Sequence, residues 1–493
     1  MRISVQDFKG ITRIDDFRLE QISVLAGTNS GGKSSLVQLI MLLKQSLEAR
    51  SPEAPLKLNK PYVSLGRFEN LPRRAPGIKS FRATIVLEKE DIDARLADVL
   101  SGKRKVPGMR TDSLLQEVQE VRITAEFKKP TNKVVVSAFE LSIIGERTST
   151  LQIMRKAHGK SYTIKTSPDQ LFIRRIQYRP SGLVAEAVPV MSKGQIRTTY
   201  DGKVGYSAFF PIDLDIEPAE NEYVSFSPVL TQIRNSLYAT FERISYIGPL
   251  REEPREFYYH DDDLIDHIGN KGENAAFLLS KHADDPVDYT RFSQSTDGYS
   301  TEVRAGTLRQ AVNYWLCEVF ELAKELKVDR AKTNRYLYSV TLRNKDGGTI
   351  PITHVGFGVS QIFPILVEGL RSSQAKRLII LEQPEIHLHP RVQSWLFDFI
   401  RTVPNASFLV ETHSDHFINR LRRRVAEDQT DNLLGAINLT FVNASPNGAI
   451  YEQLELSSSG SLTRWPAGFF DQYEDDVRAI VKAQAARRRQ GRA

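Results

Sequence analysis

The chain has 493 residues, of which 41% are hydrophobic, which is enough for one large or two moderate globular cores. Its net charge of +7 is a mild excess that is compatible with nucleic acid as a partner but does not indicate one. No apolar run approaches the roughly 18 residues of a membrane-spanning helix, and Met1 leads straight into a predicted strand. We therefore expect a cytoplasmic protein without a membrane partner. The single cysteine, Cys317, excludes an intramolecular disulfide and a thiolate zinc cluster.

A glycine-rich segment at residues 27–35 reads Gly-Thr-Asn-Ser-Gly-Gly-Lys-Ser-Ser, between a predicted strand at 22–25 and a predicted helix at 36–47. It matches the G-x-x-x-x-G-K-S phosphate-binding loop. Backbone N–H groups and the start of a helix can surround triphosphate oxygens, the lysine can reach the β and γ oxygens, and a serine hydroxyl can ligate magnesium. We predict binding of ATP and Mg²⁺, with Ser34 as a metal ligand. The predicted nucleotide-binding residues of this loop are Asn29, Gly31, Gly32, Lys33, Ser34 and Ser35.

A short apolar run at residues 377–382 ends in the carboxylate of Glu382. Such a run is typical of a buried central strand, which would hold the acid beside the magnesium of the phosphate-binding loop. The competing interpretation is a core strand that ends in an exposed glutamate, and the presence of the loop disfavours it. We predict that Glu382 is the second metal ligand.

A second apolar run, at residues 407–410, leads into Glu411-Thr412-His413-Ser414-Asp415. A lone histidine is more often a surface or core residue than a functional one. Because this strand would lie beside the one that ends in Glu382, we interpret His413 as a residue that senses the γ-phosphate.

With these motifs the chain resembles the ABC-type ATPase heads of structural-maintenance-of-chromosomes proteins, of RecF-like repair ATPases and of overcoming-lysogenisation-defect (OLD) proteins. Residues 3–10 resemble the first strand and turn of such heads, and Val355-Gly356-Phe357-Gly358-Val359-Ser360-Gln361 lies where they carry their signature motif. In that family, the signature of one subunit caps the γ-phosphate held by another. The resemblance therefore implies a homodimer or higher homo-oligomer through ATP-bound heads, with nucleotide contacts in trans from Gly356, Gly358 and Ser360.

The same resemblance assigns roles after the acidic strand. Glu382 matches the magnesium-linked acid, and the next residue, usually the glutamate that polarises the attacking water, is Gln383. An amide can orient water but cannot accept its proton, so we expect slow ATP hydrolysis, or transfer of the role to Glu385. His389 stands where the family has an aspartate at the dimer contact. The catalytic candidates are Gln383, Glu385 and His413.

A closer resemblance is to AAA-labelled bacterial ATPases of phage-defence loci, similar to the ATPase subunits of PARIS and Septu systems. It depends on Tyr246–Arg251, on the run from Glu382 to Pro390, on Glu411–Asp415 with the three arginines at 422–424, and on Trp465–Asp471. It implies an ATP-driven sensor or scaffold that controls a separate effector, a nuclease or toxin. About eighty residues follow His413, too few for the nuclease domain of OLD proteins.

Two alternatives remain open. One is a RecF-like repair ATPase that binds DNA directly. Basic clusters lie at residues 103–105, 422–424 and 487–489, although such clusters are more often solvated faces or mobile tails than phosphate tracks. The other is an OLD-like single-chain nuclease that uses acidic residues of the inserted segment. These acids are Asp261, Asp262, Asp263 and Asp266.

The expected fold class is α/β, an ABC-ATPase head with a mixed sheet around the P-loop and an antiparallel β flank. The alternating runs at 81–87 and 121–127 predict the flank. We expect an inserted α+β subdomain, which includes a helix that begins with a capping box at Thr307 and Gln310. No heptad run is sustained, so we expect no long coiled coil. The predicted division is 1–145, 146–335 (the insertion) and 336–493.

Overall fold

The structure is a computed structural model of the 493-residue chain. It describes all residues except 29–30, 93–95, 99–117, 147, 158–159, 168–171, 180–181, 185–190, 193–194, 197–198, 217–221, 261–264, 296–297, 332–333, 335, 345, 373–375, 465–471 and 491–493. Two compact units divide the chain. The first comprises Met1–Leu19 and Ser34–Ile244, and the second comprises Glu20–Lys33 and Ser245–Ala493. The division into three segments that the sequence predicts differs from these two units, and it stays a prediction.

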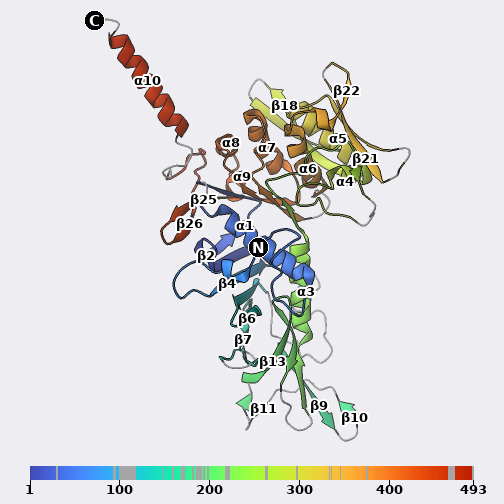
Figure 1. Cartoon of the computed structure of the whole chain (residues 1–493), viewed down its shortest axis with the longest axis vertical. Helices are drawn as coiled ribbons and strands as arrows, with labels where there is room; N and C mark the ends of the chain where they lie inside the picture. Colours follow the sequence, from blue (N-terminus) through green and yellow to red (C-terminus); the bar gives the residue numbers. More distant parts are fainter. Residues whose placement is uncertain are drawn as a thin grey trace. The chain divides into compact units, whose positions relative to one another are not determined.

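The first unit is built around an antiparallel sheet, drawn in blue to green in Figure 1. Its strands among the described residues are β1 (Arg2–Phe8), β2 (Ile11–Arg18), β4 (Ser80–Glu88), β5 (Glu120–Lys128), β6 (Val135–Ile144), β7 (Thr148–Arg155), β8 (Tyr162–Ser167), β13 (Thr199–Ser207) and β14 (Phe210–Asp215). They follow the order β14-β13-β8-β7-β6-β5-β4-β1-β2. Each strand pairs antiparallel with its neighbours. The flank predicted from alternating apolar residues is therefore confirmed.

Further elements complete this unit. They are α1 (Lys33–Ala49), η1 (Phe68–Asn70), α3 (Pro228–Glu242), a sheet of β10 (Gly182–Val184), β9 (Ile173–Arg179) and β15 (Glu222–Phe226), and a hairpin of β11 (Met191–Ser192) and β12 (Gln195–Ile196). The Phe81 ring packs between Phe8 and Phe127, with ring centroids 5.0 Å away on either side. Lys44 of α1 donates to the carbonyl oxygen of Phe241 at 2.8 Å, which fixes the end of α3 to α1.

The second unit contains a mixed sheet with the order β26-β25-β3-β24-β23-β16. These strands are β3 (Ile22–Gly27), β16 (Ile244–Ile247), β23 (Arg377–Glu382), β24 (Ala406–Glu411), β25 (Ile437–Ser445) and β26 (Gly448–Gln453). β25, β3, β24 and β23 run parallel, and β26 returns antiparallel to β25. Parallel neighbours need crossover connections. α7 (Pro390–Thr402) supplies the crossover between β23 and β24.

The other elements of this unit are mostly helical or lie in smaller sheets. They are β17 (Tyr258–Tyr259), α4 (Ala275–Lys281), β18 (Pro286–Ser295), β19 (Gly298–Thr307), α5 (Leu308–Asn313), the π-helix η2 (Tyr314–Val319), β20 (Glu325–Arg330), β21 (Leu337–Arg343), β22 (Thr349–Pro351), η3 (Ile352–His354), α6 (Gly358–Arg371), α8 (Asp415–Glu427), α9 (Asn432–Gly435) and α10 (Gln472–Gln490). The predicted capping box is confirmed, because Thr307 and Gln310 each accept from the other's backbone N–H at the start of α5.

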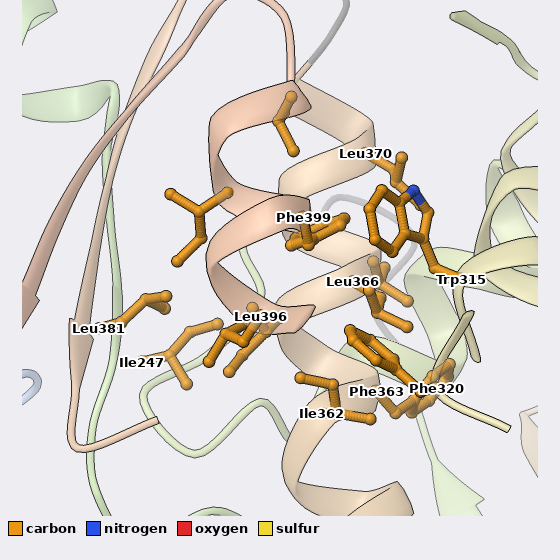
Figure 2. Packing of buried hydrophobic residues seen from close by; sticks show 14 of the residues in the cluster. Ile247, Trp315, Phe320, Ile362, Phe363, Leu366, Leu370, Leu381, Leu396 and Phe399 are labelled. Carbon is orange, nitrogen blue, oxygen red and sulfur yellow. The ribbon is translucent and has the colours of Figure 1, made fainter. Parts of the chain in front are cut away.

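The core of the second unit lies around α6 and α7, which Figure 2 shows side by side. Leu381 and Ile247, both from the sheet, lie on one side of this helix pair, and Trp315 lies on the other. The Trp315 and Phe399 rings meet edge to face, with centroids 5.1 Å apart. Gly369 of α6 permits the close approach, because a Cβ there would lie 2.6 Å from the Phe399 ring. This packing holds β23 and its terminal Glu382 in place.

Candidate functional site

The glycine-rich loop follows β3 and leads into α1. A Cβ at Gly27 would lie 2.0 Å from the Val442 carbonyl oxygen of β25, and Gly27 has φ 144°. Gly32 has φ 102°, and its carbonyl oxygen accepts a hydrogen bond from the Tyr451 hydroxyl at 2.6 Å. Only glycine fits both positions without strain. Asn29 lies outside the described residues, so its phosphate contact stays a prediction, as do those of Gly31 and Gly32.

Lys33 is the first residue of α1, and its side chain is held inside the loop. Its Nζ donates to the carbonyl oxygens of Gly27 at 3.1 Å and Thr28 at 2.7 Å. Burial lowers the pKa of Lys33, while the carboxylates of Glu411 and Glu385 oppose that shift. These neutral carbonyl partners can be exchanged for phosphate oxygens, which are better ligands for a cation. Ser34 and Ser35 are the next two residues of α1.

Two carboxylates end adjacent strands at the edge of the sheet where the loop begins. β23 and β24 are parallel, and Glu382 is in register with Glu411. Both residues are buried, at 8% and 2% exposed. Burial and the Glu411 charge raise the pKa of Glu382 to about 7, although the hydroxyl of Tyr246 and the charge of Arg251 act in the opposite direction. A divalent cation would relieve the repulsion between these carboxylates, so the pair fits Mg²⁺.

The segment after Glu382 forms a tight turn. Gln383 has φ 45°, an uncommon backbone conformation for a residue with a side chain, and its N–H donates to the Glu411 carbonyl oxygen at 2.7 Å. Glu385 accepts hydrogen bonds from Thr412 Oγ1 at 3.0 Å and from the His413 N–H at 2.6 Å. Burial raises the pKa of Glu385. The structure thus brings Glu385 against the residues that follow β24.

His413 is half-buried just beyond β24. Burial and the nearby positive charge of Lys33 lower its pKa, so its imidazole is neutral at pH 7. The next residue, Ser414, caps α8 by accepting from the Phe417 N–H, and its hydroxyl donates to Gln393 at 2.6 Å. The loop lysine, the acidic strand ends, Glu385 and His413 therefore interact in one region of the second unit.

The predicted signature segment forms the start of α6. The Ser360 hydroxyl donates to the Phe357 carbonyl oxygen at 2.7 Å, so in this structure it has a partner within its own segment. A Cβ at Gly358 would be 3.6 Å from the His387 carbonyl oxygen, and the ring centroids of Phe357 and His387 lie 5.7 Å apart. The start of α6 therefore contacts the segment that follows Glu385. The trans contacts of Gly356, Gly358 and Ser360 stay a prediction.

Sequence reasoning assigned no role to Glu411 or Arg251. Glu411 stood in a quoted run, but only the pairing of β24 with β23 shows that it faces Glu382 in register. Arg251 is 6% exposed and donates to the carbonyl oxygens of Glu382 at 3.3 Å and Gln383 at 3.2 Å. No local pattern marks Arg251, which stands four residues beyond the buried strand β16 and contacts residues more than a hundred positions further along the chain.

Several residues considered for binding have structural partners. Asp398, fully buried on α7, accepts from Arg424 and forms an ion pair with Arg420. Arg423 bonds Glu427, and Arg422 bonds the Gly460 carbonyl oxygen, so the arginines at 422–424 are engaged within the unit. His389 caps α7 by accepting from the Arg391 N–H. Asp266 pairs with Arg371 and Arg377. Asp261, Asp262, Asp263 and the cluster at 103–105 lie outside the described residues.

A phosphate-binding loop beside two strand-end carboxylates defines the class of P-loop ATPases. The chain belongs to the AAA ATPase domain family, whose sequence profile matches residues 1–418. Residues 435–480 match a second family, described as protein of unknown function (DUF3696). ATP and Mg²⁺ are thus the nucleotide and ion that the family implies, and the glycine loop, Lys33 and the carboxylate pair fit them. No curated protein matches the chain significantly.

Comparison with solved structures finds heads of Smc proteins. The SmcHead bound to the C-winged helix domain of ScpA has a TM-score of 0.43 and 11% identity, over 93% of this chain and 98% of that one. The SMC head domain from Thermotoga maritima has a TM-score of 0.36 and 10% identity, over 92% and 98%. The Smc head domain with an extended coiled coil from Pyrococcus furiosus has a TM-score of 0.41 and 9% identity, over 92% of this chain and 96% of that one. These TM-scores are low, so the likeness carries no weight for function. Among the described residues, no helix is long and apolar enough to span a membrane.

Proposed function

We propose that this chain is an ATP-dependent switch that hydrolyses ATP slowly and controls a separate effector protein, a nuclease or toxin, in bacterial anti-phage defence. The observation that carries the proposal is the turn after β23, where an amide, Gln383, stands between the buried carboxylate of Glu382 and the half-buried carboxylate of Glu385. This turn lies at the same edge of the sheet as the end of β3, from which the phosphate-binding loop starts.

The proposed roles follow from the chemistry of each group. Glycine N–H groups and Lys33 bind the phosphates, with Asn29 and Ser35 as further contacts. Ser34 and Glu382 hold Mg²⁺, which neutralises charge on the β and γ phosphates. His413, kept neutral by its surroundings, donates to or accepts from the γ-phosphate region.

Slow turnover follows from how the candidate bases are held. Gln383 can orient water but cannot take its proton. Glu385 can, and its raised pKa makes it a stronger base than an exposed glutamate. However, both of its oxygens accept hydrogen bonds, from Thr412 and His413. Both bonds stabilise the charged carboxylate and so weaken it as a proton acceptor, which supports a low rate.

We propose that two heads close on ATP, with Gly356, Gly358 and Ser360 of one copy meeting the nucleotide of the other. Opening after hydrolysis would then change a protein interface, so the ATP cycle would act as a timer for an attached effector. The resemblance of motifs to phage-defence ATPases supports the defence role. The candidate docking surfaces are the segment 146–335 and Trp465–Asp471, of which the latter lies outside the described residues.

Co-expression with the product of a neighbouring effector gene tests the proposal. We expect a stable complex whose effector is released or activated when ATP is added, and no response in Lys33→Ala or Glu382→Gln complexes. The chain alone should not cleave DNA or RNA with Mg²⁺ or Mn²⁺. Metal-dependent nuclease activity of the chain alone, or tight DNA binding at physiological salt with no protein partner, would contradict the proposal.

A further inference from the structure

Arg251 is a buried cation beside the proposed hydrolytic turn. Its Nη1 donates to the Gln383 carbonyl oxygen at 3.2 Å, to the Pro249 carbonyl oxygen at 3.4 Å and to Gln361 Oε1 at 3.4 Å, and its Nη2 donates to the Glu382 carbonyl oxygen at 3.3 Å. The planar guanidinium thus contacts two separate elements of the second unit. One is the end of β23 with its turn, and the other is the first turn of α6.

The charge of Arg251 persists in this position. Burial lowers its pKa to about 10, and the nearby Glu385, Tyr246 and Glu382 oppose that shift, so the guanidinium is protonated at pH 7. Its buried Nε has no hydrogen-bond partner. A buried charge with an unsatisfied N–H is expensive, and apolar residues of similar volume often replace such groups without loss of stability. Stability alone therefore does not account for an arginine here.

The contacts of Arg251 join two segments that the proposed function needs to act together. Gln361 directly follows Ser360, at the amino end of α6. The Glu382 and Gln383 carbonyls belong to the turn in which Gln383 has φ 45°. The direction of those carbonyls fixes the path of the turn and hence the positions of the Glu382 and Glu385 side chains. A shift at the amino end of α6 would therefore reach the turn through one side chain.

We propose that Arg251 is a positioning residue that couples the amino end of α6 to the Glu382–Glu385 turn, through Gln361 on one side and the two backbone carbonyls on the other. The inference rests on the proposed function, because it concerns the rate of ATP hydrolysis. Arg251 does not need to touch the nucleotide in this role. It keeps the turn in the geometry for hydrolysis only while the start of α6 is in place.

The test separates the α6 side of this link from the turn side. Gln361→Leu has a similar size but no acceptor for Arg251. We expect its kcat for ATP to fall about tenfold or more, while the KM and the calorimetric Kd for ATP stay within roughly threefold of wild type. Gln361→Glu keeps an acceptor and should retain kcat within about threefold. Arg251→Lys loses the planar fork and should behave like Gln361→Leu.

Arg424→Lys is the matched control, since Arg424 is also 6% exposed and binds the buried Asp398. It should lower the unfolding midpoint without changing kcat per folded molecule. Unchanged kcat in Gln361→Leu overturns the inference alone, and so does an equal loss in Gln361→Leu and Gln361→Glu, which would indicate packing. A wild-type chain without ATP turnover overturns the proposed function and this inference together.

Discussion

At the scale of single residues, the site holds two like charges close together. Glu382 and Glu411 end neighbouring parallel strands, and both are buried. Repulsion and burial together raise the pKa of Glu382 to about 7. The folded chain without metal is therefore destabilised at this position, and a bound Mg²⁺ would offset the loss. Such local destabilisation is common where stability and function compete.

Glu382→Gln should stabilise the metal-free chain. Between the ordinary carboxyl pKa of 4.5 and about 7, the folded chain holds a proton that the unfolded chain has lost. Stability therefore falls as pH rises through this window and stays level above it. In EDTA without nucleotide, Glu382→Gln should remove this fall and gain up to about 3 kcal/mol at pH 8. Urea unfolding at pH 5 and pH 8 measures the effect. Glu455→Gln, at an exposed site, is the control, and an equal loss between pH 5 and pH 8 in wild type and Glu382→Gln would contradict the account.

The sequence predicted part of this site, and local pattern explains which part. Lys33 and Glu382 belong to short motifs with fixed spacing, and the chemistry of such motifs can be inferred from the sequence without knowledge of the fold. The importance of Glu411 depends on strand register, and that of Arg251 on contacts more than a hundred residues away in the chain. Contacts between residues far apart in the chain produce no periodic pattern in the sequence, so sequence reasoning could not assign roles to these two residues.

At the scale of elements, helix α6 depends on a glycine where it crosses α7. Gly369→Ala should destabilise the chain by about 1–3 kcal/mol, because the added methyl group overlaps the Phe399 ring. Helix propensity alone predicts the opposite sign, a gain of about 1 kcal/mol. Urea unfolding decides between them. Gly435→Ala is the control, since a Cβ there meets no atom within 4 Å. Adding Phe399→Leu to Gly369→Ala should recover part of the loss, and a more stable Gly369→Ala would show that the crossing tolerates a methyl group.

The sequence predicted most elements around the site but not their arrangement. Arg377–Glu382 forms a strand as expected, because a short apolar run is a local signal. The pairing of β25 with β3 in the central sheet, parallel along six residue pairs, was not predicted from the sequence. That pairing places Val442 against Gly27 and explains why this glycine is required.

At the scale of the whole molecule, the proposed switch requires two copies. A non-hydrolysable ATP analogue with Mg²⁺ should convert monomers to dimers in light scattering, and ADP should not. Phe357, 57% exposed at the start of α6, should lie in the interface. Phe357→Asp should therefore block the analogue-induced dimer, whereas Tyr259→Asp, at a 58% exposed aromatic residue, should leave it intact. A chain that stays monomeric with the analogue would contradict the proposal that two heads close on ATP.

Steady-state ATP hydrolysis by the purified chain tests the central claim most directly, measured beside Lys33→Ala, Glu382→Gln and Gln383→Glu. The account predicts Mg²⁺-dependent turnover below about 1 s⁻¹ in wild type, against a typical enzyme value of about 10 s⁻¹. Lys33→Ala and Glu382→Gln should lose this turnover, and Gln383→Glu should raise it if the native amide limits the rate. Turnover that is the same in wild type, Lys33→Ala and Glu382→Gln would contradict the account.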